Sequence, residues 1–238
     1  MEANQIIDAM RANYIHCSSY EDVGSVRIVT QTQASEKLLI GNFAHVFLRP
    51  DLLKLELFTK EQEVERRFVI QCDGDSVRSF EEHSTQGTNT FAYDSFASAL
   101  KTTAGITAGV TNVVFSLLGE IDHGYSMLNA NQMKRTDDQV VDGQVCFTID
   151  FVIDPTVSIE ATAWISADNF SLMKFEQRSN FTASYRDSIR EYARMFYEAE
   201  GIPMKDSDEA ITREVIIKFD NITFNNSINV DKLISHVF

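Results

Sequence analysis

The 238-residue sequence predicts a mainly β protein of the α+β class, with one antiparallel sheet as its centre. Many segments alternate apolar and polar residues with a period of two, and turn signals such as Asp-Gly separate them. Only the first segment and parts of the middle and second half show the helical period of 3.6. We therefore expect about ten strands, an N-terminal helix and two or three inserted helical segments in a single domain.

The N-terminal segment is predicted to be an amphipathic helix. Ile6, Met10 and Tyr14 are spaced four residues apart, and Ile7 lies beside them on the same face. The pattern ends near Ser18. This apolar stripe is typical of a helix that packs against a sheet.

The first half of the chain then predicts a run of strands. The expected segments are Val23–Thr32, Leu38–Leu48, Leu53–Leu57, Val64–Cys72 and Val77–Phe80. The Asp73-Gly74 pair predicts a hairpin turn between the last two. Leu38–Leu48 is apolar on both of its faces, which predicts that both faces are covered.

The composition changes between Gln86 and Gly119, where Thr, Ala, Gly and Ser become frequent. Here we expect a short helix over Phe91–Leu100 and an amphipathic helix over Val110–Leu118. Strands then return, and the apolar stripe of Tyr185–Phe196 predicts one more helix among them. The expected later strands are Val145–Ile153, Ile159–Ile165, Phe170–Gln177 and Glu214–Phe224.

The charge balance is strongly acidic, with 21 Lys and Arg against 35 Asp and Glu and a formal net charge of −14. This excludes non-specific nucleic-acid binding, which needs a basic surface. No apolar run is long enough to predict a transmembrane helix. The first residues, Met1 to Asn4, lack the basic and apolar regions of a secretory signal. Two locations stay open: the cytoplasm, or an exported protein whose leader precedes the printed sequence.

No motif predicts catalysis or a cofactor. The sequence lacks a phosphate-binding glycine loop and the Gly-x-Ser-x-Gly nucleophile elbow, and its five histidines show no metal-ligand spacing. His45 lies in an apolar strand and is interpreted as a hydrogen-bonded interior histidine. We therefore expect a non-enzymatic protein without metal or cofactor, and an enzyme with an unrecognised site is kept as an alternative.

The three cysteines allow two readings. Cys17, Cys72 and Cys146 could all be buried thiols, or one disulfide could leave one thiol free. Cys72 and Cys146 lie in strand-like segments flanked by Asp-Gly, so they would be the first pair to consider.

Three motifs in order carry a family resemblance. An opening helix precedes Ser19-Tyr20-Glu21-Asp22-Val23-Gly24, a strand ends in Phe47-Leu48-Arg49-Pro50-Asp51, and Ile70 to Val77 forms a strand–Asp-Gly–strand turn. The stretch from Gly41 to Phe80 resembles the lipoprotein-carrier (Lol-type, LolA/LolB-like) family of bacterial periplasmic proteins. Asp142 to Phe147 and Ile165 to Asp168 are similar to segments of its uncharacterised predicted periplasmic members.

The resemblance implies an unclosed β-barrel of about eleven antiparallel strands in one domain, residues 1–238, with helical lid insertions at about 91–118 and 182–200. It also implies a periplasmic, non-enzymatic carrier that binds lipid or lipoprotein acyl chains in an apolar cavity beneath the lid. Arg49 matches the family's arginine that braces the closed lid through backbone carbonyls, and a salt bridge at the rim is the alternative. The expected cavity lining is Phe43, Phe47, Leu55, Phe68, Ile70, Phe147 and Phe151.

The expected partners follow from this reading. They are a lipid or acylated lipoprotein and a membrane-anchored partner protein. The alternative is an envelope assembly or stress-signalling adaptor that uses the same fold for protein–protein interaction without transport.

Overall fold

A computed structural model describes residues 1–85, 87–103, 110–119, 127–154, 158–181 and 211–228. The expected helix over Tyr185–Phe196, and with it the lid insertion at 182–200, lies outside these residues. The described elements are α1 (Ala3–His16), β1 (Ser19–Gln31), β2 (Glu36–Leu48), β3 (Leu52–Glu61), β4 (Val64–Asp73), β5 (Val77–His83), β6 (Gly87–Tyr93), α2 (Phe96–Thr103), α3 (Val110–Leu118), a 3-10 turn (Met127–Asn129), β7 (Gln132–Arg135), β8 (Gln139–Val141), β9 (Gln144–Asp154), β10 (Ile159–Ser166), β11 (Leu172–Phe181) and β12 (Ile211–Phe224).

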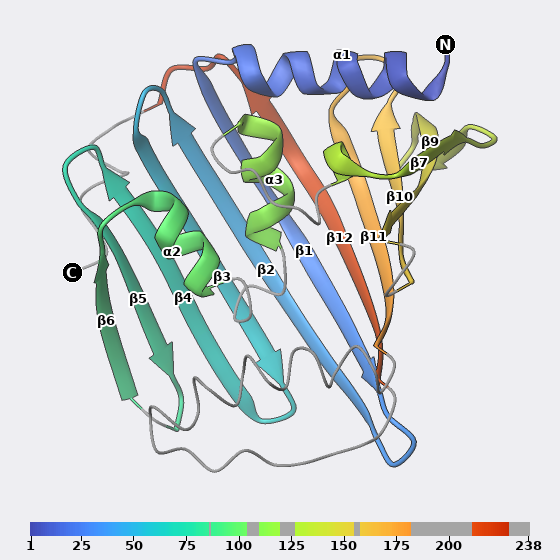
Figure 1. Cartoon of the computed structure of the whole chain (residues 1–238). Coiled ribbons are helices and arrows are strands. Elements are labelled where there is room, and N and C mark those ends of the chain that lie inside the picture. The colour runs from blue at the N-terminus through green and yellow to red at the C-terminus, as the bar shows by residue number, and fades with distance from the viewer. Residues whose placement is uncertain (86, 104–109, 120–126, 155–157, 182–210, 229–238) are drawn as a thin grey trace.

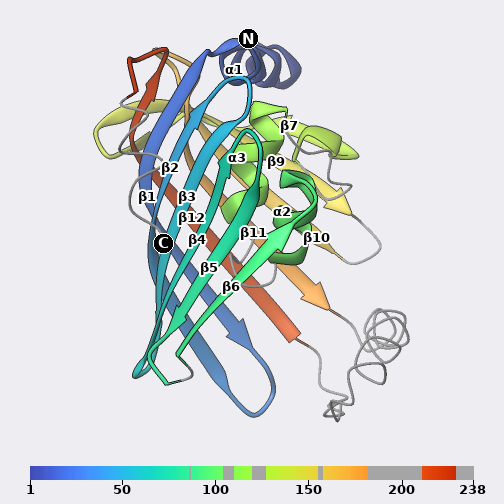
Figure 2. The same cartoon turned by 90° about the vertical axis from the view of Figure 1, so that its left-hand side faces the viewer.

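Within the described residues, the strands form one antiparallel sheet of 12 strands that does not close into a barrel. Its order is β6-β5-β4-β3-β2-β1-β12-β11-β10-β9-β7, and β8 pairs with β9 outside this path. The sheet curves around α2 and α3, which lie against its hollow face, while α1 crosses one end of the strands (Figures 1 and 2). The predicted fold class is therefore confirmed.

The register of the sheet decides which side chains reach the hollow face. β1 pairs with β2 on one side and with β12 on the other, so the two ends of the sequence meet in mid-sheet. Opposite pairs on β1 and β2 are Tyr20 with Phe47, Asp22 with His45 and Gly24 with Phe43. Since successive strand residues point to opposite faces, all of these pairs share the hollow face.

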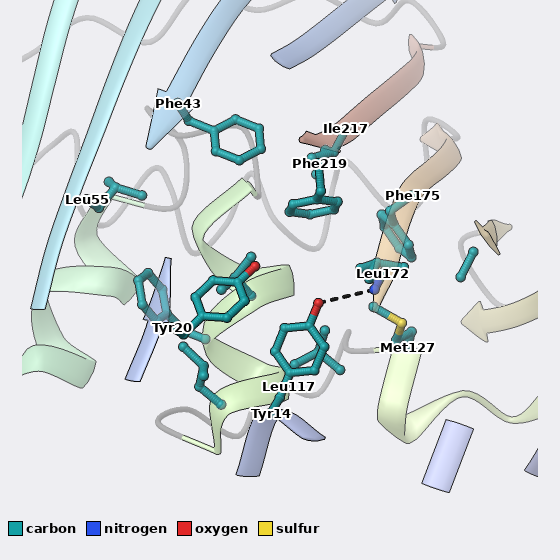
Figure 3. Packing of buried hydrophobic residues seen from close by; sticks show 14 of the residues in the cluster. Tyr14, Tyr20, Phe43, Leu55, Leu117, Met127, Leu172, Phe175, Ile217 and Phe219 are labelled. Carbon is teal, nitrogen blue, oxygen red and sulfur yellow. Dashed lines mark hydrogen bonds between the residues drawn. The ribbon is translucent and has the colours of Figure 1, made fainter. Parts of the chain in front are cut away.

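The helix α1 follows the predicted pattern. Ile6, Ile7, Met10 and Tyr14 are its buried residues, and it ends where Cys17 takes an extended backbone. Figure 3 shows Tyr14 among the buried side chains, where its hydroxyl accepts a hydrogen bond from the Leu172 backbone N–H of β11 at 3.2 Å. The amphipathic helix thus closes one end of the sheet through contacts with strands from both halves of the chain.

Two expectations about local structure are wrong. The segment Gly87–Tyr93 is a strand, so the expected helix over Phe91–Leu100 begins only at Phe96. β6 is an edge strand with mostly exposed residues, and an exposed strand carries no alternation of buried and polar positions. The outer face of β2 is not covered along its length either, since Leu38 and Ile40 are 44 % and 50 % exposed.

Gly24 is a position where the packing of the sheet requires glycine. A Cβ atom there would clash with the Lys218 carbonyl oxygen of β12 and with the Phe43 ring of β2. The backbone oxygen is fixed by the sheet and cannot move away. We expect Gly24→Ala to lower the free energy of unfolding by about 1–3 kcal/mol, the usual cost of overpacking. Urea unfolding measures this loss. Gly143→Ala is the comparison, because a Cβ at Gly143 meets no neighbour within 4 Å but strains a turn residue with φ of 83°. The two variants together separate the steric cost of an added Cβ from its conformational cost.

Candidate functional site

The hollow face of the sheet carries the residues expected to line a cavity. Phe43, Phe47, Leu55, Phe68, Ile70 and Phe151 are all buried and belong to one hydrophobic cluster. The other face of the same strands carries more polar and exposed positions. The register of the sheet therefore places these side chains on the face that meets the helices.

Phe147 is the exception among the expected lining residues. It is half-buried on β9, toward the β7 end of the sheet, and its ring lies 5.9 Å from the Phe170 ring. The Arg135 guanidinium stacks over it at 5.0 Å from the ring centroid. Phe147 thus belongs to the rim of the interior.

Helix α3 occupies the interior beneath the sheet's curve. Val114, Phe115, Leu117 and Leu118 are at most 1 % exposed, and Phe115 packs edge-to-face against Phe96 of α2 with centroids 5.0 Å apart. The structure therefore shows a closed arrangement in which helix side chains occupy the apolar interior (Figure 3). Sequence analysis predicted this helix and its apolar stripe.

Arg49 directly follows β2 and connects the sheet to the ends of helices α1 and α3. Its Nε donates to the Cys17 carbonyl at 2.9 Å, and Nη2 donates to the carbonyls of Leu118 at 2.8 Å and Tyr14 at 3.4 Å. Its guanidinium also lies 5.0 Å from the centroid of the Phe47 ring. Because the last carbonyls of a helix lack partners and carry partial negative charge, a cation is stabilising where α1 and α3 end.

A buried polar group interrupts the apolar interior. The Tyr20 hydroxyl donates to Asp22 Oδ2 at 2.5 Å, and His45 Nδ1 lies 2.6 Å from Asp22 Oδ1. The His45 backbone N–H donates to the same Oδ1 at 3.2 Å. The Asp22 and His45 side chains are both 0 % exposed. The interpretation of His45 as a hydrogen-bonded interior residue is confirmed, but Tyr20 and Asp22 were not anticipated as its partners.

The signal for this group was present but weak. Tyr20, Asp22, Val26 and Ile28 share one parity of β1, so an aspartate stands in an otherwise apolar row. A charged residue on an apolar strand face indicates either solvent exposure or a buried polar partner. Only the register, which places Asp22 opposite His45, decides between them.

Comparison with solved structures finds proteins of similar arrangement along nearly the whole chain. LprF from Mycobacterium bovis matches with a TM-score of 0.44 at 10% identity, covering 96% of this chain and 95% of that one. A putative outer membrane lipoprotein-sorting protein domain from Vibrio parahaemolyticus matches with 0.37 at 7% identity, covering 98% and 97%. The LolA superfamily protein NE2245 from Nitrosomonas europaea matches with 0.32 at 10% identity, covering 97% of each chain.

Sequence comparisons add no relative. No protein-family model matches the chain. No curated protein matches it either.

Two open grooves lie elsewhere on the sheet. One of about 520 Å³ is lined by residues of β7, β9, β10 and β11, among them Asp150, Glu160 and Arg178. The other, of about 470 Å³, is lined by residues of β2 to β5 and the turn after β5. Neither groove is lined by a residue of α1, α2 or α3. The expected apolar cavity beneath the lid is thus not one of these two grooves.

The alternative of a Cys72–Cys146 disulfide is not found. All three cysteines are free thiols, with Cys17 and Cys146 buried and Cys72 half-buried. β4 carries Cys72 and β9 carries Cys146, and in the sheet β3, β2, β1, β12, β11 and β10 lie between them. Burial raises the pKa of the Cys17 and Cys146 thiols, which keeps them protonated at neutral pH.

Within the described ranges, no group of three or more His, Cys, Asp or Glu side chains is placed to hold a metal ion. The helices of the same ranges include none that is both long and apolar enough to cross a membrane.

Burial also affects the two tyrosines near α1. Desolvation raises the pKa of Tyr14 far above its usual value, and burial together with the Asp22 carboxylate does the same for Tyr20. A raised pKa in the folded state means that stability is complete below the unfolded value, about 10, and falls as pH rises further. We expect the free energy of unfolding to fall by about 1.4 kcal/mol per pH unit for each tyrosine above pH ~10.

Urea unfolding between pH 8 and pH 11.5 measures this slope. The Tyr20→Phe variant removes one of the two titrating groups, so its slope should be shallower above pH ~10 and equal to that of the wild type below pH ~9. An unchanged slope in Tyr20→Phe would contradict the assignment.

Proposed function

We propose that this chain is a non-enzymatic periplasmic carrier that binds an acyl chain between the hollow face of its sheet and helices α1–α3. The observation that supports it best is the contact set of Arg49, whose guanidinium donates hydrogen bonds to backbone carbonyls where α1 and α3 end, beside a large apolar sheet face. Such a connection holds the ends of both helices against the sheet. The family resemblance of the sequence supports the carrier reading and the periplasmic location.

The energetics suit reversible binding. An acyl chain loses about 0.8 kcal/mol of favourable transfer free energy for each CH₂ left in water. Val114, Phe115 and Leu117 of α3 occupy the interior, so a ligand would exchange with them. Exchange of one apolar surface for another changes the free energy much less than opening an empty cavity would. Binding and release can then both proceed without an external energy source.

Arg49 is proposed to brace the lid. When the helices move, its guanidinium and the freed carbonyls can be hydrated, since the residue is only partly buried. A closed lid held by a few hydrogen bonds to a charged group is stabilised by about 1–3 kcal/mol. That range permits a minor open population at equilibrium.

The first test is organic extraction of the purified protein followed by lipid mass spectrometry. A displacement titration with a fluorescent fatty-acid probe runs in parallel. Stoichiometric lipid or saturable displacement in the micromolar range is expected. An empty protein without saturable uptake would refute the carrier proposal.

Replacement of Arg49 tests the brace. We expect Arg49→Leu to lower the free energy of unfolding by about 1–3 kcal/mol and to speed release of bound probe, because the helix carbonyls lose their donor. Arg49→Lys should behave similarly, since one ammonium cannot reproduce the planar fork that spans both helices. Stopped-flow release of probe is the measurement. Arg11→Leu, at an exposed position of α1, is the matched control and should release probe like the wild type.

A second candidate function is the adaptor. Val23, Leu38, Ile40 and Phe58 of β1, β2 and β3 are 42 % to 50 % exposed, and such apolar surface favours a protein partner. The adaptor function would be preferred over the carrier function if the protein binds no lipid. A membrane-anchored partner protein fits either function.

A further inference from the structure

The buried group of Tyr20, Asp22 and His45 is unexplained by the carrier function. An apolar ligand site needs no ionisable side chains, and burying a carboxylate is costly unless its oxygens accept several hydrogen bonds. Here a carboxylate and an imidazole on the hollow face are both 0 % exposed. These ionisable side chains therefore indicate a function that hydrophobic side chains could not perform.

The hydrogen bonds determine which ring nitrogen carries a proton. Asp22 accepts from the Tyr20 hydroxyl, from the His45 backbone N–H and from His45 Nδ1. An ionised carboxylate has no proton to donate, so toward Nδ1 it can act only as an acceptor. The proton of a neutral His45 therefore lies on Nδ1, and Nε2 presents a lone pair.

The Nε2 atom is the unsatisfied end of this group. It is buried, and no group of the described residues hydrogen-bonds to it. The ring is enclosed by apolar neighbours: the Phe43 centroid is 5.0 Å away and the Phe115 centroid of α3 is 5.4 Å away, edge-on. A buried polar atom without a partner indicates either strain or a functional contact made in another state. Because Phe115 of α3 packs edge-on against this ring, displacement of Phe115 would open space beside the imidazole.

We propose that His45 Nε2 is the polar anchor for the free carboxyl group of a long-chain fatty acid bound beneath α3. The proposal rests on the carrier function above and names its ligand class. Asp22 and Tyr20 are positioning residues that hold the imidazole so that Nε2 faces the space that Phe115 leaves.

A carboxyl group satisfies this atom where other lipid ends do not. A carboxylic acid can donate its proton to the Nε2 lone pair, or transfer it and accept a charge-assisted hydrogen bond from the imidazolium that Asp22 stabilises. An ester has no proton to donate to a neutral imidazole. The phosphodiester group of a phospholipid likewise carries no proton at neutral pH, and it is bulkier than one planar carboxyl group.

The path for the tail leads away from the end that α1 covers. Val26, Ile28, Phe43 and Leu57 line the hollow face in that direction and are all buried apolar residues. From His45 to Leu39 the strand β2 covers six residues, about 20 Å at the rise of an extended strand. The carboxyl group would therefore lie nearest α1, and the chain would extend along the strands toward their opposite end.

The test compares two ligands with the same twelve-carbon acyl chain, one with a free carboxyl group and one whose carboxyl proton is replaced by a methyl group. Dodecanoic acid and methyl dodecanoate are titrated against the fluorescent probe with the full chain. We expect the wild type to bind the acid at least ten times more tightly than the ester. Dodecanol, which has a hydroxyl donor but cannot ionise, should bind with intermediate affinity.

Variants of His45 then test whether this residue causes the preference for the acid over the ester. His45→Asn keeps an amide donor near the position of Nδ1 and removes Nε2, so the acid-to-ester ratio should fall to about one while ester affinity changes less than twofold. His45→Gln places an amide group near Nε2 and should retain part of the preference. His83→Asn is the matched control, because His83 is a buried histidine of β5 whose Nδ1 bonds Thr85. It should keep the wild-type ratio.

A second readout does not depend on folding of the variants. In ¹⁵N-histidine-labelled wild-type protein, saturating dodecanoic acid should shift one Nε2 resonance, whereas the ester should leave it in place. Equal binding of acid and ester by the wild type, with no Nε2 shift, would overturn the anchor and leave the carrier function standing. Absence of binding by both ligands would overturn both proposals.

Discussion

The Phe115→Ala variant should unfold more easily than the wild type and bind an acyl chain more tightly. Phe115 is fully buried and packs against Phe96 and His45. Its truncation removes contacts and leaves a cavity, which typically costs about 3–5 kcal/mol of stability. The same cavity lies where the proposed ligand would bind, so displacement of α3 becomes easier. The two measurements should therefore move in opposite directions.

Urea unfolding with and without dodecanoic acid measures both effects in one series. Ligand that binds only the folded state raises stability by RT ln(1 + [L]/Kd), so the variant should gain more from saturating ligand than the wild type. Phe91→Ala is the control, since Phe91 is 51 % exposed on the edge strand β6. Weaker ligand binding by Phe115→Ala would argue against an interior site beneath α3.

The second large effect is expected from Asp22→Ala. The change removes the acceptor of three hydrogen bonds and leaves the Tyr20 hydroxyl and two His45 donors buried without it. Removing one partner of a buried, hydrogen-bonded charged pair typically lowers the free energy of unfolding by about 3–5 kcal/mol. Thermal and urea unfolding should show this loss at neutral pH.

Asp220→Ala is the matched control for that variant. Asp220 lies on the neighbouring strand β12, opposite Val23, and is exposed. Its replacement should change the free energy of unfolding by less than about 0.5 kcal/mol. If Asp22→Ala were equally mild, the carboxylate would not be the centre of the buried group.

Much of the fold could be predicted because burial on one side of a strand produces alternation in the sequence. The row of Val145, Phe147, Ile149 and Phe151 predicted β9, and the spacing of Ile6, Met10 and Tyr14 predicted α1. The strand β6 could not be found in this way. Both of its faces are exposed, so neither parity of its residues is constrained by a core.

The candidate site was predictable only in part. The apolar residues Phe43, Phe47 and Leu55 followed from strand periodicity, and Arg49 from a family motif. Asp22 could not be assigned, because a polar residue in a strand has the same sequence signal whether it meets water or a buried partner. Its role depends on a pairing across 23 residues that the register creates.

The position of β12 has a consequence for how the molecule assembles. β1 follows the first helix, yet its second neighbour in the sheet is β12, the last of the described strands, with Tyr20 opposite Phe224. Contacts so distant in sequence are typical of domains that fold on the millisecond-to-second scale. Until residue 224 is available, β1 and β11 each keep an unpaired edge in the middle of the future sheet. A nascent chain would therefore depend on protection of these edges until synthesis has passed β12.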